Sequence, residues 1–104
     1  MDKTINITII NYIKLIRKKY PNFENAYLFG SFAKGYQGKD SDIDLALIFT
    51  DLNNSERFNI QVQLMLLASD IDSRIEPHPI SRIDFQSNNP FVTEIQNTGI
   101  KISA

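Results

Sequence analysis

The sequence contains no cysteine, which excludes disulfide bonds, thiolate metal sites and cysteine nucleophiles. It also lacks an excess of either charge, because 11 Lys and Arg residues stand against 12 Asp and Glu residues. A formal net charge of −1 offers no broad attraction for a nucleic-acid backbone, so direct nucleic-acid binding is not expected. Polar residues interrupt the N-terminal segment too often for a signal peptide or a membrane span. We therefore expect a cytoplasmic protein that does not associate with a membrane.

The composition that remains is that of one ordinary globular domain. The chain has 104 residues, of which 42% are hydrophobic and 22% are charged. This balance is typical of globular proteins rather than of disordered or fibrous ones. No repeat, low-complexity segment or linker divides the sequence. We expect residues 1–104 to form a single domain, too small to combine a catalytic domain with a separate substrate domain.

The first half of the chain has the pattern of a helix followed by two strands. Apolar residues at helical spacing predict an N-terminal amphipathic helix that ends near Pro21; they are Ile5, Ile9, Tyr12, Ile13 and Ile16. The apolar run 26–29, which Gly30 ends, predicts a short strand. Residues 42–49 alternate and predict a second strand. Its two faces carry different residues, with Ile43, Leu45 and Leu47 on one and Asp42, Asp44 and Ala46 on the other.

A second helix is predicted after residue 53. Asn53 and Glu56 have the spacing of a capping box, and the apolar-rich run that follows extends to about Leu67. The apolar residues of this helix form two faces; one consists of Phe58, Val62, Met65 and Leu66, and the other of Ile60, Leu64, Leu67 and Ile71. Two interpretations stay open. Either the helix contacts both the core and a partner protein, or it is deeply buried in the domain.

The C-terminal part has the pattern of a strand and a short helix. Residues 73–77 predict a third strand, which the prolines of EPHPI place at a sheet edge or a strand end. Asn89 and Pro90 can start a short helix that runs to about Thr98, with Gly99 after it and IKI as a final extended segment. Together the elements predict an α/β fold, with a small mixed β-sheet flanked by helices.

Two acidic residues share one face of the second predicted strand. Asp42 and Asp44 point the same way about 7 Å apart along the chain, so both carboxylates can face one common point. Two like charges buried together would raise one pKa and destabilise the fold. A divalent cation removes this conflict, and oxygen ligands of this kind suit Mg²⁺ or Mn²⁺. The pair therefore indicates a metal site.

A glycine-containing turn lies just before the acidic pair. Gly30, Ser31 and Gly35 allow the backbone to approach an anion, and Lys34 adds a positive charge. The turn has the GxxxxG spacing of a P-loop, but Tyr36 and Gln37 stand where that motif needs Lys and Ser or Thr, so a Walker-type NTPase is rejected. An anion site beside a metal site indicates a nucleotide. The alternative is that these glycines and aspartates are ordinary loop residues.

The same residues resemble a known superfamily. Gly30 and Ser31, followed after ten residues by Asp42-x-Asp44, look like the GSx10DxD signature of the DNA polymerase β-like nucleotidyltransferases. GSFAKG and SDIDLAL are closely similar to the minimal nucleotidyltransferase (MNT) branch, and RIEPHPI and EIQNTGIKI are weakly similar to the tail of its small members. The resemblance covers most of the chain. It implies the nucleotidyltransferase (DNA polymerase beta-like) fold, with nucleotide binding at Gly30, Ser31 and Lys34.

The resemblance also implies a third carboxylate on a neighbouring strand, and Glu76 of RIEPHPI matches it. Alternation places Asp72 on the same face, so parity alone does not choose, but the EPHPI match favours Glu76. The catalytic and metal-binding residues are then Asp42, Asp44 and Glu76. Many members of the family carry Asp at this third position and Arg in place of Lys34. His78, the single histidine, is either a general base or, as is more common, a structural residue.

What the resemblance implies about function is an adenylyltransferase that acts on a protein. Minimal members are similar to the antitoxins of HEPN/MNT toxin–antitoxin pairs, of a type VII-like kind, in which AMP from ATP is transferred to a tyrosine of the HEPN toxin with the help of Mg²⁺ or Mn²⁺. Such a protein forms a hetero-oligomer with its toxin, and a homo-oligomer is left open. Two alternatives remain. One is a non-catalytic antitoxin that neutralises its partner by binding, and the other is a transferase acting on a small molecule such as an aminoglycoside.

Overall fold

The computed structural model describes residues 3–35 and 41–104 of the chain. Helices and strands follow one another in the order α1 (Lys3–Lys19), β1 (Phe23–Phe29), α2 (Ser31–Lys34), β2 (Ile43–Phe49), α3 (Asn54–Ser69), β3 (Ile75–Ser81), α4 (Arg82–Phe85), α5 (Pro90–Thr98) and β4 (Ile100–Ile102). The short helices α2 and α4 were not expected from the sequence. Each is a single turn, too short to show an apolar period.

The four strands form one mixed sheet in the order β3-β2-β1-β4. Strand β1 is antiparallel to both β2 and β4, whereas β3 runs parallel to β2. The predicted α/β fold with a small mixed sheet is confirmed. The strand bounds differ, because β1 begins three residues earlier than expected and β3 extends to Ser81. Pairing with neighbouring strands extends both segments beyond what their local pattern indicates.

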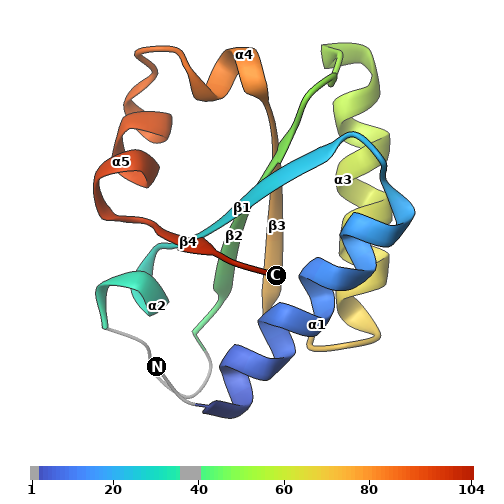
Figure 1. Ribbon diagram of the computed structural model, residues 1–104, viewed down its shortest axis with the longest axis vertical. Helices are drawn as coiled ribbons and strands as arrows, with labels where there is room; N and C mark the ends of the chain where they lie inside the picture. Colours follow the sequence, from blue (N-terminus) through green and yellow to red (C-terminus); the bar gives the residue numbers. More distant parts are fainter. Residues whose placement is uncertain (1–2, 36–40) are drawn as a thin grey trace.

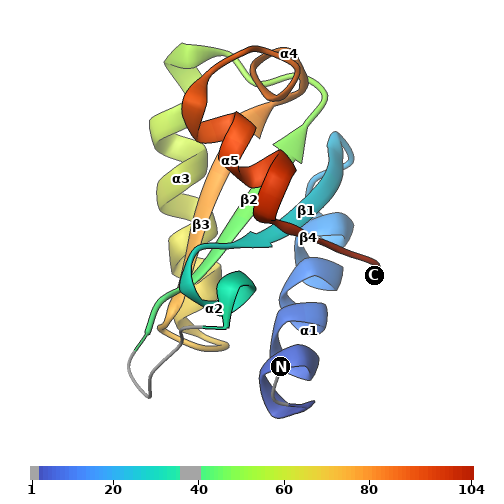
Figure 2. The same ribbon diagram turned by 90° about the vertical axis from the view of Figure 1, so that its left-hand side faces the viewer.

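Helices cover both faces of the sheet. Figures 1 and 2 show α1 and α3 on one side and α5 on the other, while α2 lies beyond the end of β1; the buried Phe32 of α2 belongs to the cluster of α1 and α3. The larger apolar cluster joins α1 and α3 to the face of β2 that carries Ile43, Leu45 and Leu47. A smaller cluster lies on the opposite face and contains Ala46, Ile48 and Ile95. The alternation predicted for β2 therefore holds, and the face of Ala46 is also the face of Asp44.

The two terminal helices form as their sequences predict. The five apolar residues expected to face the core from α1 are the buried residues of that helix, and the helix ends two residues before Pro21. In α5, the side chain of Asn89 accepts a hydrogen bond from the amide of Phe91, Pro90 occupies the first turn, and Gly99 follows the last residue. Local capping chemistry thus determines where α5 begins.

Helix α3 starts where expected, but the cap differs from the prediction. The side chain of Asn53 makes no capping bond to the backbone; its amide donates instead to Oε1 of Glu56. The helix is held to α1 by the buried hydroxyl of Tyr12, which donates to the carbonyl of Leu64 at 2.8 Å. Burial raises the pKa of the Tyr12 hydroxyl, so it acts here as a neutral donor.

One face of α3 is not buried. Phe58 is 74% exposed and Leu66 64% exposed, while Leu64 has no exposed surface. We call the exposed residues the apolar stripe of α3; they are Phe58, Val62, Met65 and Leu66. Deep burial of the whole helix, one of the two interpretations left open by the sequence, is therefore wrong for this stripe. Ile71, expected on the buried face, is also exposed, because it lies beyond the end of the helix.

Strand β3 forms one edge of the sheet, as its prolines predict. Pro77 and Pro79 have no backbone N–H, so they leave no donor at these positions for an additional strand. The side-chain amide of Gln61 donates to the carbonyl of Pro77, and α3 thereby covers part of the edge. Both features protect the edge against pairing with another chain.

Among the described residues, no helix combines the length and apolar character needed to cross a membrane.

The packing of α3 predicts opposite outcomes for two leucines two positions apart. Leu64→Ala removes a side chain without exposed surface from the larger cluster, and we expect it to lower the free energy of unfolding by about 2–5 kcal/mol. Leu66→Ala shortens a side chain of the apolar stripe and should change it by less than about 0.5 kcal/mol. Urea unfolding followed by circular dichroism measures both. Equal losses for the two variants would contradict the assignment of the buried face.

Candidate active site

The pairing register of three strands brings the acidic residues together. Asp44 of β2 lies opposite Phe29 of β1 on one side and opposite Glu76 of β3 on the other. Asp42 precedes β2, and the adjoining amide of Ile43 donates to the carbonyl of Arg74 at 2.7 Å. The segments that carry Asp42, Asp44 and Glu76 are therefore held side by side, although Asp42 and Glu76 are 34 positions apart in the sequence.

The three carboxylates interact with one another. The pKa of Glu76 is raised, first by a hydrogen bond with Asp42, then by partial desolvation and by repulsion from Asp42 and Asp44. Asp42 and Glu76 are exposed, and the side chain of Asp44 is 24% exposed. The expectation that Asp42 and Asp44 are buried together is wrong, since Asp42 lies outside the strand. The conflict between like charges nevertheless exists, and it includes Glu76 as a third member.

Asp72, the alternative to Glu76 as the third carboxylate, pairs with Arg74. Its carboxylate accepts hydrogen bonds from Nε and Nη2 of Arg74, at 3.1 and 2.8 Å, and from the Arg74 amide. This bonding to the Arg74 side chain lowers the pKa of Asp72. Asp72 lies in the segment before β3, and its bonds to Arg74 stabilise this segment. Of the two residues, the structure brings Glu76 to Asp44.

Gly30 connects β1 to α2 directly beside Asp44. Its φ of 73° and ψ of −151° lie in a region that only glycine adopts readily. A Cβ atom at this position would also lie 2.5 Å from Oδ2 of Asp44. Ser31 then begins the single turn of α2, whose first amide groups have no partner within the helix. The absence of a side chain at Gly30 therefore lets the backbone approach the carboxylates closely.

Lys34, at the end of α2, forms an ion pair with α5. Its Nζ lies 2.8 Å from Oε1 of Glu94 on α5, and both side chains are well exposed. An exposed ion pair of this kind contributes at most about 1 kcal/mol, so it would not hold Lys34 against a bound anion. Tyr36 and Gln37, used above to reject a P-loop, lie outside the described residues.

His78 contacts the acidic site, which the sequence did not reveal. Its Nε2 lies 3.2 Å from Oδ1 of Asp44. The ring packs against Phe29 and Phe91, with centroid distances of 5.1 and 6.1 Å, and these two rings also contact each other. Alternation along β3 already predicted that His78 shares the face of Glu76, but only the pairing of β3 with β2 shows which carboxylate it reaches. The aromatic contacts hold the imidazole in place against Asp44.

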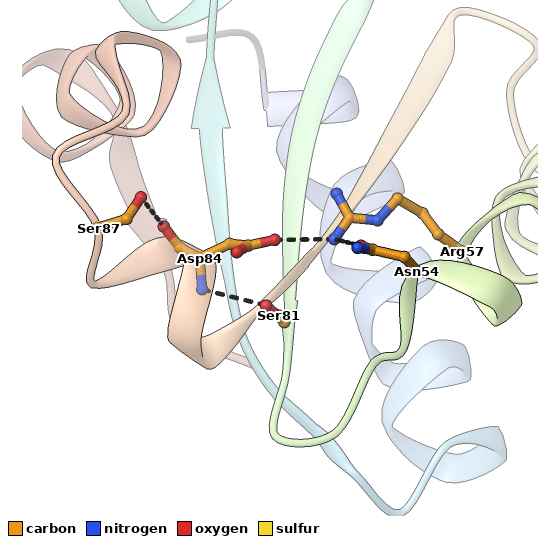
Figure 3. Close-up of polar contacts among 5 residues, drawn as sticks. All are labelled: Asn54, Arg57, Ser81, Asp84 and Ser87. Atoms are coloured by element: carbon orange, nitrogen blue, oxygen red, sulfur yellow. Dashed lines mark hydrogen bonds and ion pairs between the residues drawn. The ribbon is translucent and has the colours of Figure 1, made fainter.

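A pocket of about 340 Å³ lies next to His78, along the outer edge of β3. We call it the β3-edge pocket; its lining residues are Arg57 and Gln61 of α3, His78, Pro79 and Ile80 of β3, Asp84 of α4, Ser87 and Asn89 of the following loop, and Phe91 and Val92 of α5. Figure 3 shows Arg57 of α3 reaching Asp84 of α4, and Nη2 of Arg57 donates to Oδ2 of Asp84 at 2.8 Å. No local sequence signal marks these residues, because they come from separate elements.

The donor set of the acidic site fits a divalent cation. Three carboxylates offer hard oxygen ligands, and their mutual repulsion is relieved when a cation binds. In residues 3–35 and 41–104, however, no three His, Asp or Glu side chains already stand in the arrangement of a metal site. The contact with Asp42 favours the protonated form of Glu76 and raises its pKa. Binding a cation to all three carboxylates therefore requires that Glu76 loses this proton.

Comparison with known proteins identifies a matching family and similar solved structures. The family described as "Polymerase beta, Nucleotidyltransferase" matches residues 11–104. Protein adenylyltransferase MntA of Shewanella oneidensis is 40% identical over 65 residues, which are 62% of this chain and 45% of MntA. The chain thus matches less than half the length of this relative.

Solved structures show the same fold. A toxin–antitoxin complex with AMP-PNP contains a chain that is 28% identical, with a TM-score of 0.62 over 92% of this chain and 70% of that one. A complex of the tri-AMPylated Shewanella oneidensis HEPN toxin with its MNT antitoxin contains a chain that is 24% identical, with a TM-score of 0.59 over 91% of this chain and 68% of that one. Because its identity is only 24%, the similarity to the second structure supports a common fold and nothing further.

The geometry of the turn predicts different outcomes for two glycines that both have positive φ. Gly35→Ala places a Cβ in open space at φ 79°, and we expect a loss of about 1 kcal/mol from backbone strain. Gly30→Ala adds the overlap with Asp44 to a more strained backbone, and should cost on the order of 3 kcal/mol. Urea unfolding measures the losses, and NMR chemical shifts of Asp44 report its displacement in the Gly30 variant alone. Undisturbed Asp44 shifts in Gly30→Ala would show that the close approach is not as described.

Proposed function

The chain belongs to the polymerase beta nucleotidyltransferase family, and from this premise we propose that residues 1–104 act as a single minimal domain that transfers AMP from ATP to a protein. One observation supports the proposal most directly. The side chains of Asp42, Asp44 and Glu76 lie close together, and the backbone of Gly30 lies directly beside Asp44. A nucleoside triphosphate combines both requirements of this site, since its phosphates are anions that bind to a backbone turn and share a cation with carboxylates.

The proposed substrate lies with its phosphates against Gly30 and Ser31, and Lys34 turns from Glu94 to contact them. Asp42, Asp44 and Glu76 hold Mg²⁺ or Mn²⁺. The cation supplies charge neutralisation for the triphosphate and the transition state. The residues of the chain supply orientation: the register of β2 and β3 fixes the spacing of Asp44 and Glu76, and His78 fixes the rotation of the Asp44 carboxylate through Nε2.

The reaction is an in-line displacement at the α-phosphorus of ATP. The oxygen of the acceptor hydroxyl forms a bond to this phosphorus, the bond to the bridging oxygen breaks, and pyrophosphate leaves. The hydroxyl proton passes to the carboxylate of Glu76. Glu76 can take this role because the pairing of β3 with β2 holds it beside Asp44.

We propose a tyrosine of a HEPN toxin as the acceptor, which would make the chain the antitoxin of the pair. MntA, 40% identical over the matched residues, is named a protein adenylyltransferase, and the chain of 28% identity comes from a toxin–antitoxin complex. The apolar stripe of α3 supports a protein partner, because it leaves large apolar side chains exposed on one helix.

Transfer of a radioactive label from [α-³²P]ATP tests the proposal. The chain is incubated with Mg²⁺ and the product of the neighbouring gene, and the label should appear covalently on that protein. Asp44→Asn should reduce labelling on the order of 10³-fold or more, because several kcal/mol of charge stabilisation are lost. Chelation of the metal with EDTA should have the same effect.

Asp72→Asn is the matched control, since Asp72 is acidic and close in sequence to Glu76 but binds Arg74. It should keep labelling within about threefold, whereas Glu76→Gln should abolish it. The reverse result would assign the third carboxylate to Asp72. Inhibition of the toxin without any covalent label would favour an antitoxin that acts by binding alone, and labelling of an aminoglycoside would favour a small-molecule transferase.

A further inference from the structure

The two carboxylate oxygens of Asp44 face two different sides of the site. Oδ2 faces the glycine turn, since a Cβ on Gly30 would lie 2.5 Å from it. Oδ1 faces β3, where Nε2 of His78 lies at 3.2 Å. Asp44 therefore separates a phosphate side, at Gly30 and Ser31, from a β3 side, at Glu76 and His78.

An in-line displacement requires the attacking oxygen and the leaving group on opposite sides of phosphorus. If pyrophosphate leaves toward Gly30 and Ser31, the acceptor hydroxyl arrives from the β3 side. The β3-edge pocket lies on that side, and His78 belongs both to its lining and to the contacts of Asp44. The pocket is thus in the direction from which the acceptor approaches.

The size and lining of this pocket suit one aromatic side chain. A volume of about 340 Å³ is at the small end for ligand pockets, enough for one ring but not for a whole nucleotide. Phe91 presents a half-exposed ring, 6.1 Å from that of His78, against which a second ring can stack. Arg57 and Gln61 add polar groups to this lining.

The pocket continues into the apolar stripe of α3. Arg57 and Gln61 line the pocket one turn apart on the helix, and Phe58 and Val62 of the stripe follow each of them in sequence, so the two rows are adjacent around the helix. A protein resting on the stripe can therefore place a side chain in the pocket. A free small molecule would leave the stripe uncovered.

We propose that the β3-edge pocket is the acceptor subsite, an inference that rests on the proposed function. The pocket receives a tyrosine side chain of the partner protein, and that protein docks on the apolar stripe of α3. The ring lies against the exposed side of Phe91, next to His78, and its hydroxyl points to the acidic site. The nucleobase lies outside this pocket.

A binding experiment on the chain alone tests the subsite without any transfer. The ¹⁵N-labelled chain is saturated with Mg²⁺ and AMP-PNP and then titrated with N-acetyl-tyrosinamide, with N-acetyl-alaninamide as the control probe. The tyrosine probe should shift the side-chain amides of Gln61 and Asn89 and the backbone amide of Phe91, and AMP-PNP should shift Gly30 and Ser31. The inference is overturned if the tyrosine probe shifts none of the three pocket groups, or if AMP-PNP alone shifts them, since the pocket would then hold the base.

A transfer experiment tests the role of the subsite in the reaction. Phe91→Ala should raise KM for the protein acceptor about tenfold, through loss of the ring contact, and change KM for ATP less than twofold. Ile100→Ala is the matched control, because Ile100 is similarly exposed, 46% against 43%, but lies on β4 at the opposite edge of the sheet. It should change neither constant.

The outcomes separate this inference from the proposed function. Labelling by the unaltered chain together with an unchanged acceptor KM in Phe91→Ala overturns the subsite and leaves the transferase intact. Absence of labelling on any partner, together with specific shifts from the tyrosine probe, overturns the proposed function and supports the pocket as a site for an aromatic hydroxyl.

Discussion

The parallel register between β2 and β3 is the constraint on which the site depends. It places Glu76 beside Asp44 and draws in Asp42 through the hydrogen bond from Ile43 to Arg74. Three carboxylates so placed repel one another. The pKa of Glu76 is raised by its contact with Asp42 and by this repulsion. Such an arrangement costs stability unless a cation occupies it, and this cost is the physical reason to associate the site with a metal-bound phosphate.

The two faces of the sheet have different tasks. The face covered by α1 and α3 contains the larger apolar cluster and provides most of the burial. The opposite face has a small cluster around Ala46 and Ile95, which leaves room for polar side chains on the same strands. Alternation along β2 makes this division possible, since each residue of the core face is followed by one on the opposite face, where Asp44 lies beside Ala46 and Ile48 of the smaller cluster.

The edge strand β3 resists pairing with another strand, yet a pocket lies along it. Its prolines and the contact from Gln61 prevent another strand from pairing there, but the side chains that line this edge still form a pocket. An interaction at this edge must therefore use side chains in a pocket rather than backbone hydrogen bonds. This is consistent with an acceptor that contributes a single residue to the site.

Local patterns were sufficient to predict α1, α5, the mixed α/β class and the positions of Gly30 and Asp44, because helical period, capping residues and strand alternation are properties of neighbouring residues. They included Asp42 in the strand, although it precedes β2. Parity could not choose between Asp72 and Glu76; the structure did so by pairing Asp72 with Arg74 and placing Glu76 opposite Asp44. The contact of His78 with Asp44, the pairing of Lys34 with Glu94 and the β3-edge pocket join residues from separate elements. Only the tertiary structure decides such contacts, since the distance between two side chains on different strands or helices depends on register and packing that no short segment encodes.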